Sequence, residues 1–352
     1  MTPVPVSVLT GFLGAGKTTL LNRLLADPAL SRTAVIVNEF GAVGLDHALI
    51  EASGEDVIEL SDGCLCCTVR GDLVDTLERL LDGTRAVDRI VIETTGLADP
   101  APVLRAIMAH PTRAAAMRLD GVVTVVDAVN GLATLARHAE ARRQVAVADR
   151  LVVSKRDVGG EGADDALDGA LRALEGALRA LNPGAPVLDA QALDHAALLD
   201  AGLVDGAGRI DPDRWLRDGE VPARGHDDHA HGAIRSVSLV HDGAVPLAAV
   251  QDLLDLAMSA HGPRLLRLKG IVRVAEHPGE PLVLHAVQTT LHPPARLPAW
   301  PTPDRRTRLV AIVDGVPERH LRDLFAAFTG APRLDAPDRA GLMSNPLAVP
   351  GP

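Results

Sequence analysis

Short apolar runs alternate with amphipathic stretches over roughly the first two hundred residues. The clearest stretch carries leucines at 167, 171, 174, 178 and 181, steps of four and three that predict a helix with one apolar face. Such alternation predicts a mostly parallel sheet with helices on both faces. The other expected helices are Lys17–Ala26 and Gly71–Asp82, and the expected strands are Val4–Thr10, Thr33–Val37, Val57–Leu60, Arg89–Ile92, Gly121–Val126, Leu151–Ser154 and Ala185–Ala190.

The alternation stops at Asp218–Gly232, which is rich in proline, glycine, histidine and charged residues. This composition is typical of a linker or a long loop. Beyond it the order of elements predicts a small α+β domain with an antiparallel sheet. We therefore divide the chain into an N-terminal α/β domain (1–217), a linker (218–233), a C-terminal domain (234–329) and a loose tail (330–352). The expected C-terminal elements are strands Ile234–Val240, Leu265–Ala275, Leu282–Leu291 and Arg308–Val313, and helices Val245–Ala260 and Glu318–Phe328.

Composition narrows the class of protein. The 352 residues are 47% hydrophobic, which excludes a wholly disordered chain. The chain has only 2% aromatic residues and a net charge of −11. We therefore expect no nucleic-acid partner, because such binding needs basic surfaces for the phosphates and aromatic side chains on which bases stack. No run of 18 apolar residues predicts a membrane span, and the N-terminus does not resemble a signal peptide, so we expect a cytoplasmic protein.

The segment Gly11–Thr18 matches the phosphate-binding pattern G-x-x-x-x-G-K-[ST], between a predicted strand and a predicted helix. Glycines let successive N–H groups point at phosphate oxygens, and the helix N-terminus adds positive charge. Lys17 is expected to bridge the β- and γ-phosphates, and the Thr18 hydroxyl to bind Mg²⁺. The predicted phosphate-binding residues are Gly11, Gly14, Ala15, Gly16, Lys17, Thr18 and Thr19.

The hydrophobic strand Arg89–Ile92 runs into Glu93, and Gly96 follows three positions later. In a P-loop NTPase an acid at this place stands near Mg²⁺, and the Gly96 amide would sense the γ-phosphate. Lys17 and Glu93 are the residues to which we assign a catalytic role. No catalytic base is evident in the sequence, which suits slow hydrolysis.

The strand Leu151–Ser154 ends in the pattern S-K-x-D. A carboxylate at Asp157 can accept two N–H bonds from guanine, whereas adenine would leave it partly unpaired. The alkyl stem of Lys155 would lie over the base. The usual motif begins with Asn or Thr, and Ser154 is shorter, so its bracing role is left open. Guanine recognition by Ser154, Lys155 and Asp157 is the favoured interpretation over an ordinary strand-end turn.

All three cysteines of the chain, Cys64, Cys66 and Cys67, lie within four positions. Thiolates suit Zn²⁺ and other late first-row ions, so a metal site is favoured over a redox switch or inert packing. A tetrahedral site needs a fourth ligand, for which Glu39, a histidine or water are candidates. The loop histidines His226, His229 and His231 are equally well explained as accessory ligands or as part of a solvated linker.

Five segments occur together in one order: GFLGAGKTTLLNRLL, VNEFG, GCLCC, IETTGLADP and SKRD. In this the chain resembles CobW-type P-loop GTPases, which are related to the urease- and hydrogenase-maturation GTPases. The resemblance covers about residues 4–328. Two positions depart from the family pattern: Ala42 stands where many relatives have a second acid, and Ser154 begins the base motif.

The resemblance implies a GTPase that alternates between GTP and GDP with Mg²⁺ and carries a divalent metal at Cys64, Cys66 and Cys67. Zn²⁺ or Co²⁺ are the first candidates, and Ni²⁺ or Fe²⁺ remain open. A client metalloprotein would receive the metal, and oligomers that depend on nucleotide or metal are compatible with it. The alternatives are a GTP-regulated thiol redox sensor and a metal buffer in which GTP is a structural ligand.

Overall fold

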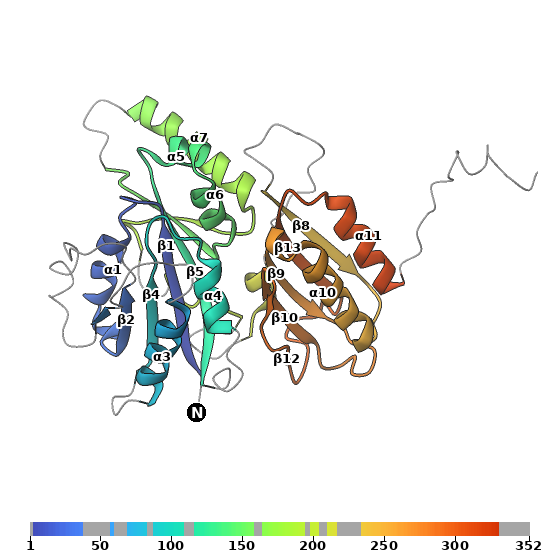
Figure 1. Ribbon diagram of the computed structural model, residues 1–352. Coiled ribbons are helices and arrows are strands. Elements are labelled where there is room, and N and C mark those ends of the chain that lie inside the picture. The colour runs from blue at the N-terminus through green and yellow to red at the C-terminus, as the bar shows by residue number, and fades with distance from the viewer. Residues whose placement is uncertain are drawn as a thin grey trace, which may run out of the picture.

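The computed structural model describes residues 3–37, 57–59, 69–82, 87–108, 116–157, 164–193, 198–203, 210–216 and 234–330. It contains two sheets, each with its own helices, in two domains that lie side by side (Figure 1). None of the described helices is both long and apolar enough to cross a bilayer.

The N-terminal domain is built on a parallel sheet of seven strands, in the order β3-β2-β4-β1-β5-β6-β7. The predicted α/β class is confirmed. Strand β5 begins earlier than predicted, because its first residues pair with the beginning of β1. The strands are β1 (Val4–Gly11), β2 (Thr33–Val37), β3 (Val57–Glu59), β4 (Arg89–Glu93), β5 (Met117–Asp127), β6 (Arg150–Ser154) and β7 (Val187–Asp189).

Alternate strand residues pack on opposite faces of this sheet. Val6 and Val8 of β1 belong to one apolar cluster, and Leu9 belongs to the other, with helix α1 (Lys17–Leu25) and a short 3-10 turn (Pro28–Leu30). The first face is covered by α3 (Val69–Asp82), α4 (Ala101–Met108), α5 (Gly131–Arg137), α6 (Ala139–Ala146) and α7 (Asp164–Leu181).

Helices α4, α5 and α6 were not among the expected elements. Helix α4 is buried on most of its circumference, so its sequence shows no polar face, and α5 and α6 are only about two turns long.

The C-terminal domain is an antiparallel sheet in the order β11-β10-β9-β13-β8, with β12 paired to β10. Helices α10 (Leu247–His261) and α11 (Glu318–Thr329) pack together on one face (Figure 1). The expected strand Leu282–Leu291 is in fact two strands, because Gln288 has a φ of 53° and turns the chain between them. The strands are β8 (Ile234–His241), β9 (Leu265–Val272), β10 (Leu282–Val287), β11 (Thr290–Leu291), β12 (Ala295–Arg296) and β13 (Thr307–Asp314); β9 is preceded by a 3-10 turn (Gly262–Arg264).

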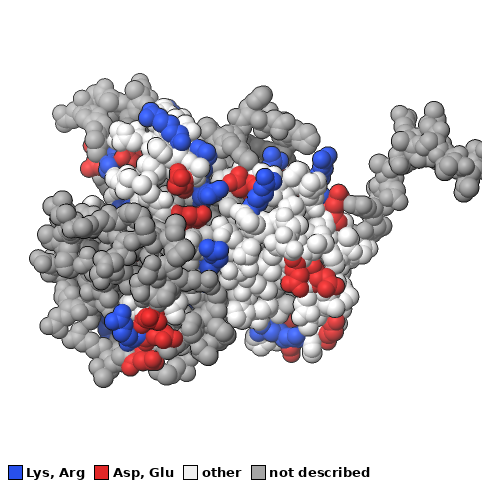
Figure 2. Space-filling model, viewed as in Figure 1, with Lys and Arg blue, Asp and Glu red and all other residues white. Residues whose placement is uncertain are grey.

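The opposite face of this sheet meets the N-terminal domain. Ile234, Leu266, Val287 and Ile312 belong to the same apolar cluster as the helices of that domain. The short helix α9 (Pro212–Leu216) contributes Trp215 to a separate small cluster on β9, β10 and β13. On the face shown in Figure 2, basic and acidic side chains adjoin each other near the boundary between the domains.

A buried carboxylate joins the two domains. Asp149, just before β6, lies 2.8 Å from Arg267 Nη2 and 2.5 Å from Lys269 Nζ, both on β9, and accepts the Val122 N–H at 2.8 Å. Burial alone would raise the pKa of Asp149, but the charges of Arg267 and Lys269 outweigh it and hold this pKa far below its usual range. The nearby His285 accepts a hydrogen bond from Arg267, and burial together with these cations lowers its pKa well below the usual value.

We predict that Asp149→Asn lowers the free energy of unfolding by about 3 to 5 kcal/mol at neutral pH, because two buried cations lose their counter-charge. The deficit should shrink below about pH 4, where the unfolded wild-type chain takes up a proton that folded Asp149 resists, so the wild type loses this stabilisation as the pH falls. Urea unfolding at several pH values measures both effects. The exposed Asp255→Asn is the control; an equal, small effect of both variants would contradict the prediction.

Candidate functional site

The phosphate-binding segment connects β1 to α1, as the sequence predicts. Gly14 and Gly16 have φ of 71° and 92°, in the left-handed region that glycine adopts most easily. Gly16 is the N-cap of α1 and brings no capping side chain, so the helix N-terminus is left open to an anion. Ala15 is buried in the core beneath the loop, and Thr19 is exposed in the first turn of α1.

Two charged residues, Lys17 at the start of α1 and Glu93 at the end of β4, lie beside this loop. The Lys17 ammonium donates to the carbonyl oxygens of Gly11 at 3.1 Å and Phe12 at 3.5 Å, and the residue is only 9% exposed. The Thr18 hydroxyl donates to Glu93 Oε1 at 2.9 Å. Because Leu9 of β1 pairs with Glu93 of β4, the two strand ends bring this carboxylate beside the helix N-terminus.

The Thr18 and Glu93 side chains fit a magnesium ion. Mg²⁺ prefers oxygen donors and usually keeps several waters, with one or two protein ligands and the phosphates completing its shell. A hydroxyl and a carboxylate 2.9 Å apart can face one such ion. Bound there, Mg²⁺ would neutralise phosphate charge, while Lys17 would hold the phosphate oxygens from within the loop.

The segment after β4 touches the phosphate-binding loop directly. A Cβ atom at Gly96 would lie 2.6 Å from the backbone nitrogen of Leu13, so only glycine fits this contact. The Thr94 hydroxyl also donates to that of Thr10, at 2.8 Å. The structure thus brings Gly96 into contact with the phosphate-binding loop.

Ser154 braces the phosphate-binding loop. Its hydroxyl donates to the Ala15 carbonyl at 2.6 Å, and both residues are buried. The shorter side chain therefore reaches the loop, a question that the sequence left open. Lys155 has a φ of 58°, and Asp157 is exposed two residues further on.

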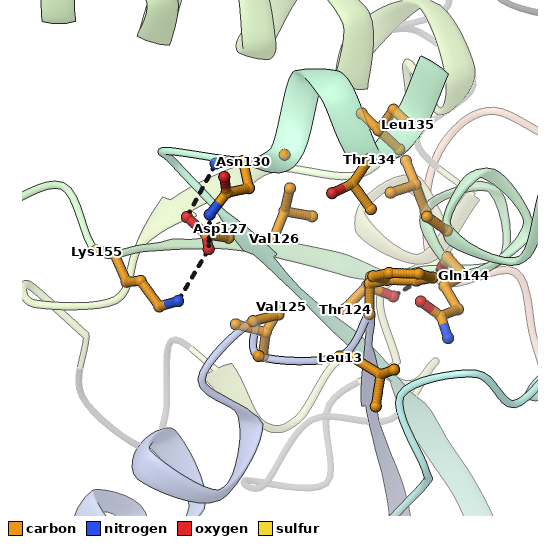
Figure 3. A pocket seen from close by; sticks show the side chains of 16 residues that line it. Leu13, Thr124, Val125, Val126, Asp127, Asn130, Thr134, Leu135, Gln144 and Lys155 are labelled. Carbon is orange, nitrogen blue, oxygen red and sulfur yellow. Dashed lines mark hydrogen bonds and ion pairs between the residues drawn. The ribbon is translucent and has the colours of Figure 1, made fainter. Parts of the chain in front are cut away.

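Asp127, at the end of β5, is a site residue that the sequence analysis missed. Its carboxylate accepts hydrogen bonds from Lys155 Nζ at 2.9 Å, from the Asn130 side chain at 3.1 Å, and from the backbone of Val129 and Asn130 (Figure 3). Burial would raise the pKa of Asp127, but these bonds, the Lys155 bond first, lower it below the usual value. An acid directly after a buried strand was the available signal.

A cavity of about 230 Å³ lies beside the phosphate-binding loop. Phe12 and Leu13 of the loop form one wall, and β5 with α5 forms another (Figure 3). Lys155 and Asp127 line it, and so does Gln144 of α6. No motif or periodicity in the sequence singles out Gln144.

All the predicted transition-metal ligands lie outside the described residues: Cys64, Cys66, Cys67, Glu39, His226, His229 and His231. Ala42, which departs from the family pattern, also lies outside them. Within the described ranges, no group of three or more His, Cys, Asp or Glu side chains is arranged to hold a metal ion.

Family models match most of the chain. Residues 5–189 match the CobW/HypB/UreG nucleotide-binding domain, and residues 234–329 match the cobalamin synthesis protein cobW C-terminal domain.

Relatives of known description match as well. The zinc chaperone YjiA of Escherichia coli is 32% identical over 334 residues, which are 93% of this chain and 99% of the relative. The zinc-regulated GTPase metalloprotein activator 1 of Schizosaccharomyces pombe is 40% identical over 163 residues, 44% of this chain and 40% of the relative.

Solved structures agree with the sequence comparison. The crystal structure of Zn(II)-bound YjiA GTPase from E. coli superposes with a TM-score of 0.66 at 27% identity, covering 93% of this chain and 99% of that one. A Zn(II)-bound triple mutant of YjiA, in which one glutamate and two cysteines are replaced by alanine, gives a TM-score of 0.67 with the same identity and coverage.

We predict that Ser154→Ala weakens the binding of both GTP and GDP by about three- to tenfold, because the loop loses one buried hydrogen bond. Ser154→Thr keeps a hydroxyl and should bind as the wild type does. Competition against a fluorescent guanine nucleotide measures both affinities. Wild-type affinity in Ser154→Ala would show that the loop needs no brace.

Proposed function

Because the chain belongs to the CobW/HypB/UreG family of GTPases, we propose that it is a metallochaperone that couples GTP hydrolysis to delivery of a divalent transition metal. Zinc is the proposed cargo, and Cys64, Cys66 and Cys67 are its proposed ligands, with Glu39 as the candidate fourth. A client metalloprotein receives the ion.

The descriptions of the relatives support zinc as the cargo over cobalt, nickel or iron. Two are zinc chaperones, among them CobW of Sinorhizobium, which is 44% identical over 130 residues, 35% of this chain and 36% of that protein. A third is a zinc-regulated GTPase that activates a metalloprotein. Three thiolates also match the ligand preference of Zn²⁺.

The register of three neighbouring strands is the observation that carries the proposal. Val37 of β2 pairs with Glu93 on one side and with Glu59 of β3 on the other. Glu39 lies two positions after Val37, and Cys64 lies five positions after Glu59, which limits their Cα distances to about 7 and 18 Å. The two strands that precede the proposed metal ligands in sequence therefore end beside Glu93, which supports a coupled site.

This placement gives the nucleotide a way to act on the metal. Lys17 and the loop hold the phosphates. The stretch Thr94–Ala98 after β4, here called the Gly96 segment, contacts a γ-phosphate that is present only in GTP. Loss of that phosphate frees the segment, and the proposed coupling passes this change on to Glu39 and the cysteines. GTP then favours metal capture, and hydrolysis favours release.

We predict that zinc loaded on the Mg²⁺·GTP form passes to a competing fluorescent chelator at the rate of GTP hydrolysis. Lys17→Ala should release zinc at the same rate whether or not GTP is added, because it cannot hold the triphosphate. Cys66→Ser should lose most of its affinity for zinc in competition with the chelator. Affinity is the required measurement, because YjiA crystallised with zinc even after two cysteines were replaced.

Equal rates of zinc release in the presence of GTP and of GDP would contradict the proposal. The protein would then be a metal buffer in which GTP is a structural ligand. A protein whose GTP cycle is unaffected by zinc removal, and is instead switched by thiol oxidation, would be a redox sensor.

A further inference from the structure

Gln144 crosses from helix α6 to the segment that contacts the phosphate-binding loop. Its Nε2 donates to the carbonyl oxygens of Gly96 at 3.2 Å and Ala98 at 2.9 Å, and the residue is 1% exposed. We propose that Gln144 is a positioning residue that holds the Gly96 segment ready for the γ-phosphate and so sets the preference for GTP over GDP. This inference rests on the proposed GTP cycle.

The Gly96 segment is held from two sides. On one side Gly96 lies against the Leu13 backbone, too close to admit a Cβ atom. On the other side the Gln144 amide binds two carbonyl oxygens of the turn that the Ala98 N–H closes onto Thr95. The Ala98 N–H bond holds the carbonyl of the Thr95–Gly96 peptide, whose plane carries the Gly96 N–H, and Gln144 holds the Gly96 and Ala98 carbonyls that follow, so the turn that orients this donor is fixed. Donors oriented in advance need no reorganisation when the charge arrives.

The chemistry of the amide argues against a packing role. Only the NH₂ group can donate to two carbonyls, so Oε1 faces away from them; it is buried without a hydrogen bond to any described residue. An unsatisfied buried acceptor costs stability, which an apolar side chain of the same size would avoid. Gln144 also lines the cavity beside Phe12 and Leu13, so the space around the amide is not fully packed (Figure 3).

The C-terminal end of helix α6, from which Gln144 projects, is itself fixed in place. Asn182 donates to three carbonyl oxygens there, those of Val145, Ala146 and Ala148. Arg267 of the C-terminal domain donates to the Val147 carbonyl at 2.5 Å. Gln144 therefore projects from a rigid support, and the C-terminal domain is part of that support.

Two isosteric replacements test the role. Gln144→Leu keeps the volume and Gln144→Glu keeps the shape, but neither can donate to the two carbonyls. The readout is the ratio of the affinities for guanosine 5′-(β,γ-imido)triphosphate and GDP, measured on the full chain with Mg²⁺. We expect this ratio to fall about tenfold in both variants, through weaker triphosphate binding with little change for GDP.

Thr307→Val is the matched control, since it removes an equally buried hydrogen-bonding group, the acceptor of the Arg273 N–H, from the C-terminal domain. It should lower the melting temperature and leave the ratio unchanged. A ratio unchanged in both Gln144 variants, or lowered equally in Thr307→Val, would overturn the inference, as would a wild type that binds both nucleotides equally. A wild type that binds neither nucleotide would instead overturn the proposed function.

Discussion

The parallel pairing of β1 with β4 and β5 is the constraint on which the rest of the site depends. It brings three strand ends to one edge of the sheet: the phosphate-binding loop after β1, Glu93 at the end of β4 and Asp127 at the end of β5. Each side chain alone is an ordinary polar residue after a buried strand. Their common edge gives a helix N-terminus, a lysine, and a hydroxyl–carboxylate pair that together suit a magnesium-bound triphosphate.

A second set of contacts ties this edge to the C-terminal domain. Gln144 binds the Gly96 segment, helix α6 continues to Val147, and Asp149 pairs with Arg267 and Lys269 of β9. Arg143 of the same helix lies within 4 Å of Asp99 after β4 and of Asp314 on β13. A displacement of the Gly96 segment therefore acts on residues that hold the second domain, which gives the nucleotide a physical route to it.

The sequence predicted those features that depend on local pattern. The phosphate-binding loop, Glu93 and the two classes of sheet follow from glycine spacing, strand-end acids and hydrophobic periodicity. Gln144 and Asp127 were missed because their partners, Gly96 and Lys155, are distant in sequence and meet only through the sheet order. The brace from Ser154 to Ala15 depends on the distance between the end of β6 and the phosphate-binding loop, which no local sequence pattern contains.

The central claim is that nucleotide and metal bind to one coupled site. Its most direct test is the affinity for the β,γ-imido triphosphate, measured by calorimetry with and without one equivalent of Zn²⁺. Coupling is reciprocal, so zinc should tighten triphosphate binding by about five- to a hundredfold and leave GDP binding nearly unchanged. Equal triphosphate affinity with and without zinc would contradict the account.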